Sequence, residues 1–300
     1  MDGTDKYYPL IQQTLDGWRN EDGPVEKKMP VEADIPEWIE RESLREEASE
    51  NEKAVSDLIV MAFFFLLRVG EYTVKSGRNN TKRTVQFRIK DVTFFKKGED
   101  GTLRQLRRNA SAEEILAADA VTLKLENQKN GWKGVCISHH STGSELMNPC
   151  RAVARRYLHI RENCSDPNCF LSAYFVDGKR ADVTDKEIST ALKVAAAVLD
   201  YPNSRGIPLA SIDTHSLRIG GANALSLAGY TDRQIKKMGR WRGETFLEYI
   251  RESLSDFSAG MAESMTKCFG FVSLEAGVYS DVTERVVEAD YNDNVSAGAA

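Results

Sequence analysis

The sequence predicts a mainly α-helical domain with a small three-stranded antiparallel sheet, an α+β fold. Three observations lead to this prediction. Apolar residues recur at helical spacing over most of the chain. Three short stretches rich in β-branched and aromatic residues lie together in the first half. The 300 residues are 41% apolar, with 12 Phe and 10 Tyr, which is enough to fill a sizeable core.

The first predicted helices follow Met29-Pro30. One ends near Trp38, and a charged helix covers residues 39–51. Residues 54–67 are apolar nearly all round, which is typical of a central, buried helix, and Gly70 is predicted to end it. Their longest apolar run, ten residues, is about half of a membrane span, so we expect no membrane partner.

The three predicted strands cover residues 84–95, 120–125 and 134–138. The last two flank Asn130-Gly131, a strong signal for a β-hairpin turn. Residues 96–119 are predicted to be an insertion that carries a short helix at about 112–118.

Five helices are predicted after the sheet, and no internal repeat is present. They cover residues 149–161, 185–199, 217–228, 231–238 and 245 to about 265. Gly229 and Gly239 stand where helix C-caps belong. Thr231 with Gln234, and Thr245 with Glu248, are capping-box pairs.

Charge is distributed unevenly along the chain. The net charge is −5, but residues 272–300 hold six acidic side chains against Arg285 alone. Residues 78–108 hold ten basic side chains against three acidic ones. We therefore expect an arm or linker at 1–26, one domain at 27–271 and an acidic tail at 272–300. The basic stretch is compatible with a nucleic-acid partner, and its plainer interpretation is a solvated strand face.

The cysteines indicate the compartment. Their number is odd and no pair spacing repeats, so we predict free thiols in a reducing environment; they are Cys136, Cys150, Cys164, Cys169 and Cys268. The first 50 residues are polar and charged, unlike a secretory signal, so we expect an intracellular protein. The cluster of His159, Cys164 and Cys169 matches no common zinc spacing, and no metal site is predicted.

Two segments near the end of the chain carry side chains suited to phosphate chemistry. In Thr214-His-Ser-Leu-Arg-Ile-Gly-Gly-Ala222, His215 and Arg218 lie three apart at a predicted helix start, where free N–H groups also attract anions. Gly220 and Gly221 would let another backbone, or DNA, approach closely. Trp241 precedes the last predicted helix and Tyr249 lies within it. Taken singly, each of these residues is also explained as an ordinary surface or core residue.

Their combined spacing is more specific. The pattern His-x-x-Arg, then Trp241 after 23 residues and Tyr249 after eight more, resembles the tyrosine recombinase (phage integrase) family. The Gly-Arg-Trp motif before the tyrosine most resembles recombinases of eukaryotic mobile elements, the Cryptons and tyrosine-recombinase retrotransposons. Upstream, Leu66-Leu-Arg-Val-Gly-Glu71 is similar to the family's first arginine box, with Arg68 and its acidic neighbour Glu71. Gln128-Lys129-Asn-Gly lies where the family has its mobile lysine, and Lys133 is an alternative in the same turn.

The resemblance covers residues 27–265 and implies the tyrosine recombinase catalytic-domain fold. It implies that Tyr249 attacks a DNA phosphate to form a 3′-phosphotyrosine, while Arg68 and Arg218 clamp the phosphate oxygens. By the same resemblance, His215 would bind the phosphate or accept the tyrosine proton. Lys129 would protonate the leaving 5′ oxygen, and the Trp241 indole N–H would donate to the phosphate. No cofactor, metal or ATP is required.

The implied partners are double-stranded DNA and further copies of the chain, as a dimer or tetramer on DNA. The location would be nuclear if the source is eukaryotic. Basic side chains of the strands and of the Gly-Arg-Trp motif are the expected DNA contacts: Arg78, Lys82, Arg83, Arg88, Lys90, Arg240 and Arg242.

Two other functions use the same residues. A type IB topoisomerase-like enzyme would nick and close DNA without pairing two sites, and a non-catalytic DNA-binding protein would keep the fold without turnover. Family members usually carry a helical domain before the catalytic one that closes over the other face of the DNA. Only 26 residues precede the predicted domain, so we expect either a fragment or a protein without that half of the clamp.

Overall fold

A computed structural model describes residues 28–74, 84–126, 134–241 and 243. The chain divides into two compact units, residues 1–250 and 251–300, and every described residue belongs to the first. The predicted arm at 1–26, the helix at 245–265 and the acidic tail lie outside the described residues.

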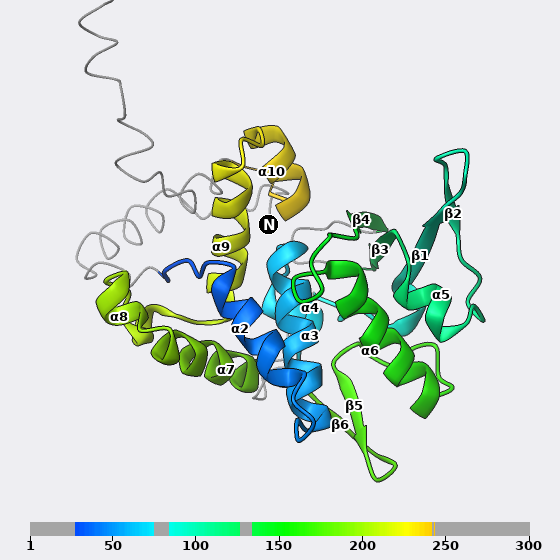
Figure 1. Ribbon diagram of the computed structural model, residues 1–300, viewed down its shortest axis with the longest axis horizontal. Coiled ribbons are helices and arrows are strands. Elements are labelled where there is room, and N and C mark those ends of the chain that lie inside the picture. Colours follow the sequence, from blue (N-terminus) through cyan, green and yellow to red (C-terminus); the bar gives the residue numbers. More distant parts are fainter. Residues whose placement is uncertain (1–27, 75–83, 127–133, 242, 244–300) are drawn as a thin grey trace, which may run out of the picture. The chain divides into compact units, whose positions relative to one another are not determined.

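The central helix of the unit is α3 (Glu50–Phe64), which packs mainly against helices from other parts of the chain. These are α2 (Asp34–Ser43), α6 (Pro149–Asn163), α7 (Asp185–Val198) and α9 (Thr214–Leu227), and Figure 1 shows their arrangement. A capping box starts α3: the Ser49 hydroxyl accepts from the Glu52 N–H at 3.2 Å, and the Glu52 carboxylate accepts from the Ser49 N–H at 2.8 Å. Residues 54–63 are all buried, which confirms the predicted core helix.

Both ends of this helical region differ from the prediction. The charged helix at 39–51 is absent, because α2 ends at Ser43 and α3 begins at Glu50. The core helix ends at Phe64 rather than at Leu67, because Leu66 adopts a left-handed φ of 49°. Gly70 does not end it and lies inside a short helix, α4 (Val69–Tyr72). The turn at Leu66 makes Arg68 the N-cap residue of α4.

The main sheet has four antiparallel strands rather than three, in the order β2-β1-β3-β4. They are β1 (Val92–Lys97), β2 (Leu103–Gln105), β3 (Ala120–Leu125) and β4 (Val135–His140). The extra strand β2 comes from the predicted insertion, which also carries the expected short helix α5 (Ala112–Leu116). The first strand begins eight residues later than predicted, because a 3-10 turn, η1 (Ile89–Asp91), precedes it. Pairing of Leu125 with Val135 confirms the strands of the predicted hairpin; its turn lies outside the described residues.

A second, two-stranded sheet was not predicted. It pairs β5 (Ala173–Val176) with β6 (Lys179–Asp182). Asp177 and Gly178 join them with φ of 49° and 72°, as a type I′ hairpin turn requires. A short helix α8 (Tyr201–Ser204) and a 3-10 turn η2 (Leu209–Ser211) then lead into α9.

The last two described helices are set by local capping. α9 begins at Thr214, earlier than predicted, because the Asp213 side chain caps it by accepting from the Thr214 N–H at 2.6 Å. α10 (Asp232–Gly239) begins at the predicted Thr231–Gln234 capping box. Its left-handed C-cap residue is Arg240, with φ 59°, and not Gly239 as predicted. No helix in the described ranges is both long and apolar enough to cross a membrane.

Candidate active site

The four described residues of the predicted catalytic set gather near the C-terminal end of α3. Arg68 caps α4, His215 and Arg218 lie in the first turns of α9, and Trp241 follows α10. The charges of Arg218 and Arg68 both act on His215, and the Trp241 ring lies against the Arg218 guanidinium. Tyr249, Lys129 and the alternative Lys133 lie outside the described residues.

Basic side chains from three elements bind the last carbonyl groups of α3 and of the turn after it. His139 of β4 donates from Nε2 to the Phe64 carbonyl at 2.7 Å. Arg240 donates to the Phe65 carbonyl at 3.0 Å and to the Leu66 carbonyl at 3.1 Å, and Arg218 also donates to the Leu66 carbonyl. Carbonyls at a helix C-terminus lack partners within the helix and carry partial negative charge, so N–H donors, and the two arginine cations in particular, are stabilised there.

Arg218 is buried, with 1% of its surface exposed. Its Nη1 donates to the Leu66 carbonyl and its Nη2 to the Gly239 carbonyl. The guanidinium carbon lies 4.1 Å from the centre of the Trp241 ring. A desolvated cation–π contact of this kind stabilises by about 2 kcal/mol. Trp241 therefore acts as a platform that fixes the plane of Arg218.

Arg68 is the more exposed of the two predicted clamp arginines, with 23% of its side chain accessible. Its backbone N–H donates to Glu71 Oε2 at 2.9 Å, and its Nη1 lies 3.4 Å from Glu71 Oε1. The Glu71 side chain is 1% exposed. Glu71 thus holds Arg68 from both its backbone and its side chain.

The pKa of His215 is lowered from its ordinary value. Burial is the largest cause, the positive charges of Arg218 and Arg68 follow, and Asp213 partly offsets them. His215 is consequently a neutral imidazole at neutral pH and can accept a proton.

Glycines allow the close contacts behind this cluster. A Cβ on Gly220 would lie 1.9 Å from the Val31 carbonyl oxygen, and one on Gly221 would lie 2.4 Å from the Phe63 carbonyl oxygen. The close backbone approach predicted for this pair is therefore made by the chain itself, between α9 and the segments around α2 and α3.

Three of the predicted DNA contacts can be placed. Arg88 pairs with Glu126 at 2.6 Å, and its side chain is 18% exposed. Lys90 is half-buried at the edge of a cavity of about 210 Å³ that Arg108 and Arg161 also line. Arg240 is 1% exposed, as Arg218 is, and its guanidinium pairs with Glu71. Arg78, Lys82, Arg83 and Arg242 lie outside the described residues.

No short-range pattern in the sequence indicates the buried pairing of Arg240 with Glu71. Its partner Glu71 is 169 positions away, and neither periodicity nor capping patterns report contacts at that separation. The same holds for His139, whose partner Phe64 is 75 positions away.

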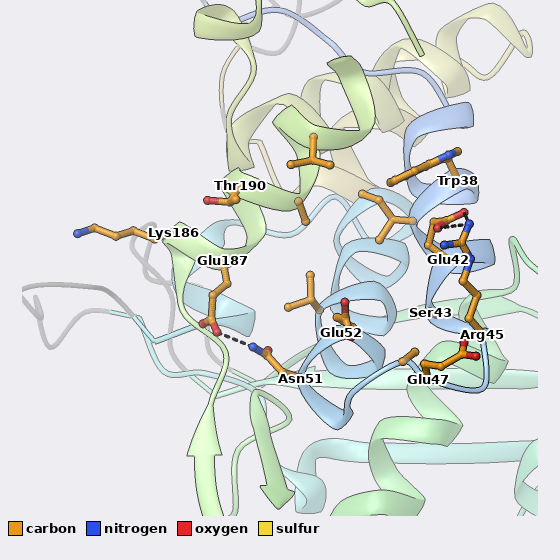
Figure 2. A pocket seen from close by; sticks show the side chains of 15 residues that line it. Trp38, Glu42, Ser43, Arg45, Glu47, Asn51, Glu52, Lys186, Glu187 and Thr190 are labelled. Carbon is orange, nitrogen blue, oxygen red and sulfur yellow. Dashed lines mark hydrogen bonds and ion pairs between the residues drawn. The ribbon is translucent and has the colours of Figure 1, made fainter. Parts of the chain in front are cut away.

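A separate cavity of about 620 Å³ lies between α2, α3 and α7, as Figure 2 shows. None of the predicted site residues lines it. Its rim carries Glu42, Glu47, Glu52 and Glu187 against Arg45 and Lys186. An acidic rim repels a phosphate backbone, so the cavity does not fit the chemistry of the basic cluster.

The cysteines of the described segments are free thiols: Cys136, Cys150, Cys164 and Cys169. His159 already has partners on both ring nitrogens, Glu50 Oε2 at 3.2 Å and the Phe175 N–H at 3.1 Å. In the segments that the structure describes, no three His, Cys, Asp or Glu side chains form a group that could hold a metal ion.

Comparison with known proteins found no matching family model and no matching curated protein. Several solved structures are similar. The Tn1549 transposon integrase in complex with transposon right end DNA is 11% identical with a TM-score of 0.40, over 82% of this chain and 67% of that one. XerH site-specific recombinase bound to a palindromic difH substrate is 13% identical with a TM-score of 0.47, over 79% of this chain and 54% of that one. XerA recombinase is 13% identical with a TM-score of 0.43, over 87% of this chain and 76% of that one. At these values the similarity assigns neither activity nor partner to the chain.

Proposed function

We propose that this chain cleaves and rejoins DNA strands through a 3′-phosphotyrosine on Tyr249, in site-specific recombination or the integration of a mobile element. One observation carries the proposal. Arg68 and Arg218, 150 positions apart, both lie close enough to His215 for their charges to lower its pKa. Cations that gather in this way repel one another, and a bound phosphate would relieve that repulsion.

The chemistry follows from the charges. The transition state of phosphodiester cleavage carries extra negative charge, which two permanently charged guanidiniums stabilise. Tyr249 Oη would attack the phosphorus and pass its proton to neutral His215. The bond from phosphorus to the 5′ oxygen breaks, and that oxygen takes a proton from Lys129. Attack by a 5′ hydroxyl on the phosphotyrosine reverses these steps, so no external energy source is needed.

Double-stranded DNA is the proposed partner, held through its phosphates, with self-association on DNA. The ten basic residues within 78–108 support this partner. The Gly-Arg-Trp motif, whose Trp241 lies eight residues before Tyr249, supports a kinship with eukaryotic mobile-element recombinases.

The test is covalent trapping on nicked DNA. A pool of duplexes with randomised sequence around a nick is incubated with the protein, and DNA in SDS-stable adducts is sequenced. Cleavage beside the nick releases a short fragment that carries the 5′ hydroxyl. This fragment diffuses away, so the covalent adduct accumulates. Label on the strand upstream of the cut should enter the adduct, and label downstream should not.

Two variants make the test specific. Tyr249→Phe should abolish the adduct, whereas Tyr230→Phe, at a tyrosine that is 50% exposed after α9, should leave it unchanged. DNA binding without any adduct would refute the proposal and favour the non-catalytic protein. With supercoiled circular DNA as the substrate, relaxation without strand exchange would favour the topoisomerase-like enzyme.

A further inference from the structure

We propose that Arg240 is a positioning residue that sets the geometry of both clamp arginines, Arg68 and Arg218. Its catalytic consequence rests on the function proposed above, whereas its structural consequence can be measured without it. Arg240 belongs to the expected DNA contacts, and the acceptors that it shares with Arg68 and Arg218 point to this different role.

The backbone at Arg240 is unusual for an arginine. With φ 59° and ψ 40° it occupies the left-handed C-cap position of α10, which favours glycine. The glycine of the motif, Gly239, stands one residue earlier, where a Cβ would lie 1.6 Å from Cζ3 of Trp241. Gly239 therefore leaves room for the Trp241 ring. Arg240, the next residue, must then adopt the left-handed conformation, which is unfavourable for arginine. A side chain kept at such a position must have contacts that compensate.

Those contacts are made by both terminal nitrogens. Nη1 donates to the carbonyls of Phe65 at 3.0 Å and Met238 at 3.1 Å. Nη2 donates to the Leu66 carbonyl at 3.1 Å and to Glu71 Oε2 at 2.8 Å. The side chains of Arg240 and Glu71 are each 1% exposed. The planar fork of a guanidinium suits this set of acceptors, and a lysine ammonium does not reproduce it.

Two of these acceptors also hold the clamp arginines. Glu71 Oε2 accepts from the Arg68 backbone N–H at 2.9 Å, and Glu71 Oε1 lies 3.4 Å from Arg68 Nη1. The Leu66 carbonyl accepts from Arg218 as well as from Arg240. Arg240 therefore shares the Glu71 carboxylate with Arg68 and the Leu66 carbonyl with Arg218. Its loss would free Glu71 and the Leu66 carbonyl to move, and both clamp arginines with them.

His215 reports on this geometry. The described groups whose charges act on it are Arg218 of α9, Arg68 of α4 and Asp213 before α9, and the two arginines lower its pKa. If Arg68 and Arg218 move away from His215, that pKa rises toward its ordinary value. A purely structural role for Arg240 would change stability and leave the pKa of His215 unchanged.

The test uses Arg240→Gly in the full chain, because glycine suits the left-handed backbone and removes only the side chain. NMR titration of the four histidines, with His215→Gln to assign the signal, should show the His215 pKa raised toward its ordinary value. The matched control Arg233→Ala, at an exposed arginine of α10, should leave it unchanged. The single-turnover rate of adduct formation should fall about 100-fold, while DNA affinity stays within about threefold.

The outcomes separate the two proposals. Absence of an adduct with the unmodified protein would refute the proposed function, and the titration would still test Arg240. A wild-type His215 pKa in folded Arg240→Gly would overturn the inference, even if stability falls. If that variant does not fold because the buried Glu71 carboxylate has lost the Arg240 guanidinium, the double variant Glu71→Gln with Arg240→Gly removes the carboxylate charge. Because Glu71→Gln by itself releases Arg68, that single variant is the reference. The His215 pKa should be higher in the double variant than in Glu71→Gln, and equal values would overturn the inference.

Discussion

The guanidinium of Arg218 lies 4.1 Å from the centre of the Trp241 ring, and both side chains are buried. The two residues are 23 positions apart, on α9 and just after α10. An indole cannot exchange protons, so this position supplies a flat, electron-rich surface rather than an acid or base. The contact orients the arginine that the proposed chemistry places on the phosphate.

Replacement of Trp241 tests the platform. Trp241→Leu removes the π face, so the rate of adduct formation in a single turnover should fall about 10- to 30-fold, as loss of roughly 2 kcal/mol predicts. Trp241→Phe keeps a π face and should lose less than about tenfold. Equal losses in the two variants would show that volume, and not the cation–π contact, is what matters.

The second prediction concerns pH. Because the pKa of His215 is lowered from 6.5, its neutral form persists below that pH. The adduct-forming rate at subsaturating DNA should therefore stay level from neutral pH to below 6.5 and fall only as pH drops through the His215 pKa. His215→Gln should abolish this acid limb, whereas His140→Gln, at an exposed histidine of β4, should retain it. An acid limb above 6.5 would contradict the assignment.

The third prediction concerns the contact between α9 and α3. In Gly221→Ala the new Cβ would lie 2.4 Å from the Phe63 carbonyl oxygen, so the helices must separate. The free energy of unfolding in urea should drop by about 1–3 kcal/mol. Gly143→Ala, where no atom lies within 4 Å of the added Cβ, should change it by less than about 0.5 kcal/mol. Equal stabilities in the two variants would show that α9 does not pack as described.

The fourth prediction concerns a buried carboxylate. Arg155 of α6 donates from Nε to Asp57 Oδ1 at 2.6 Å and also binds Glu40 of α2. Burial, with a smaller contribution from the Glu40 charge, raises the pKa of Asp57 from 3.8 to about 6 against the opposing charges of Arg155 and Arg156. Between pH 3.8 and about 6, Asp57 thus keeps its proton in the folded state and is ionised in the unfolded state.

The sign of the effect follows from linkage. The Asp57 contribution to stability is complete below pH 3.8 and is lost as pH rises through about 6. The free energy of unfolding of the wild type, minus that of Asp57→Asn, should fall by roughly 2 kcal/mol over this range. Urea unfolding at several pH values measures it, with Asp232→Asn on the surface of α10 as control. A pH-independent difference would mean that Asp57 stays ionised.

Elements with local signals were predictable. α6 follows an asparagine N-cap and a proline, and α10 starts at a capping box, so both were found close to their true bounds. β2 was missed because its three residues are all exposed and show no alternation. The β5–β6 hairpin did carry a usable signal, Asp177-Gly178, which the prediction did not use.

Features fixed by distant partners were not predictable. The chain breaks from helix at Leu66, whose carbonyl bonds to Arg218, 152 positions away, and an apolar run gives no sign of such a turn. The gathering of Arg68, His215, Arg218 and Trp241 could be expected only from their order and spacing. Arg240 is expected from the sequence to contact DNA, and no local pattern indicates that it is buried against Glu71.

The pairing of Arg240 with Glu71 also sets an order of events as the chain is made. Synthesis runs from the N-terminus, so Glu71 leaves the ribosome long before α10 exists. Until then the Glu71 carboxylate has Arg68 beside it but lacks the buried guanidinium of Arg240, so complete burial of its charge costs more free energy. The end of α3 is thus expected to stay open until α10 docks, and closing a loop of 169 residues makes that a late step. In a nascent chain, Arg68 and Arg218 are then not yet gathered, so the chain is expected not to bind nucleic acid through them before the domain is complete.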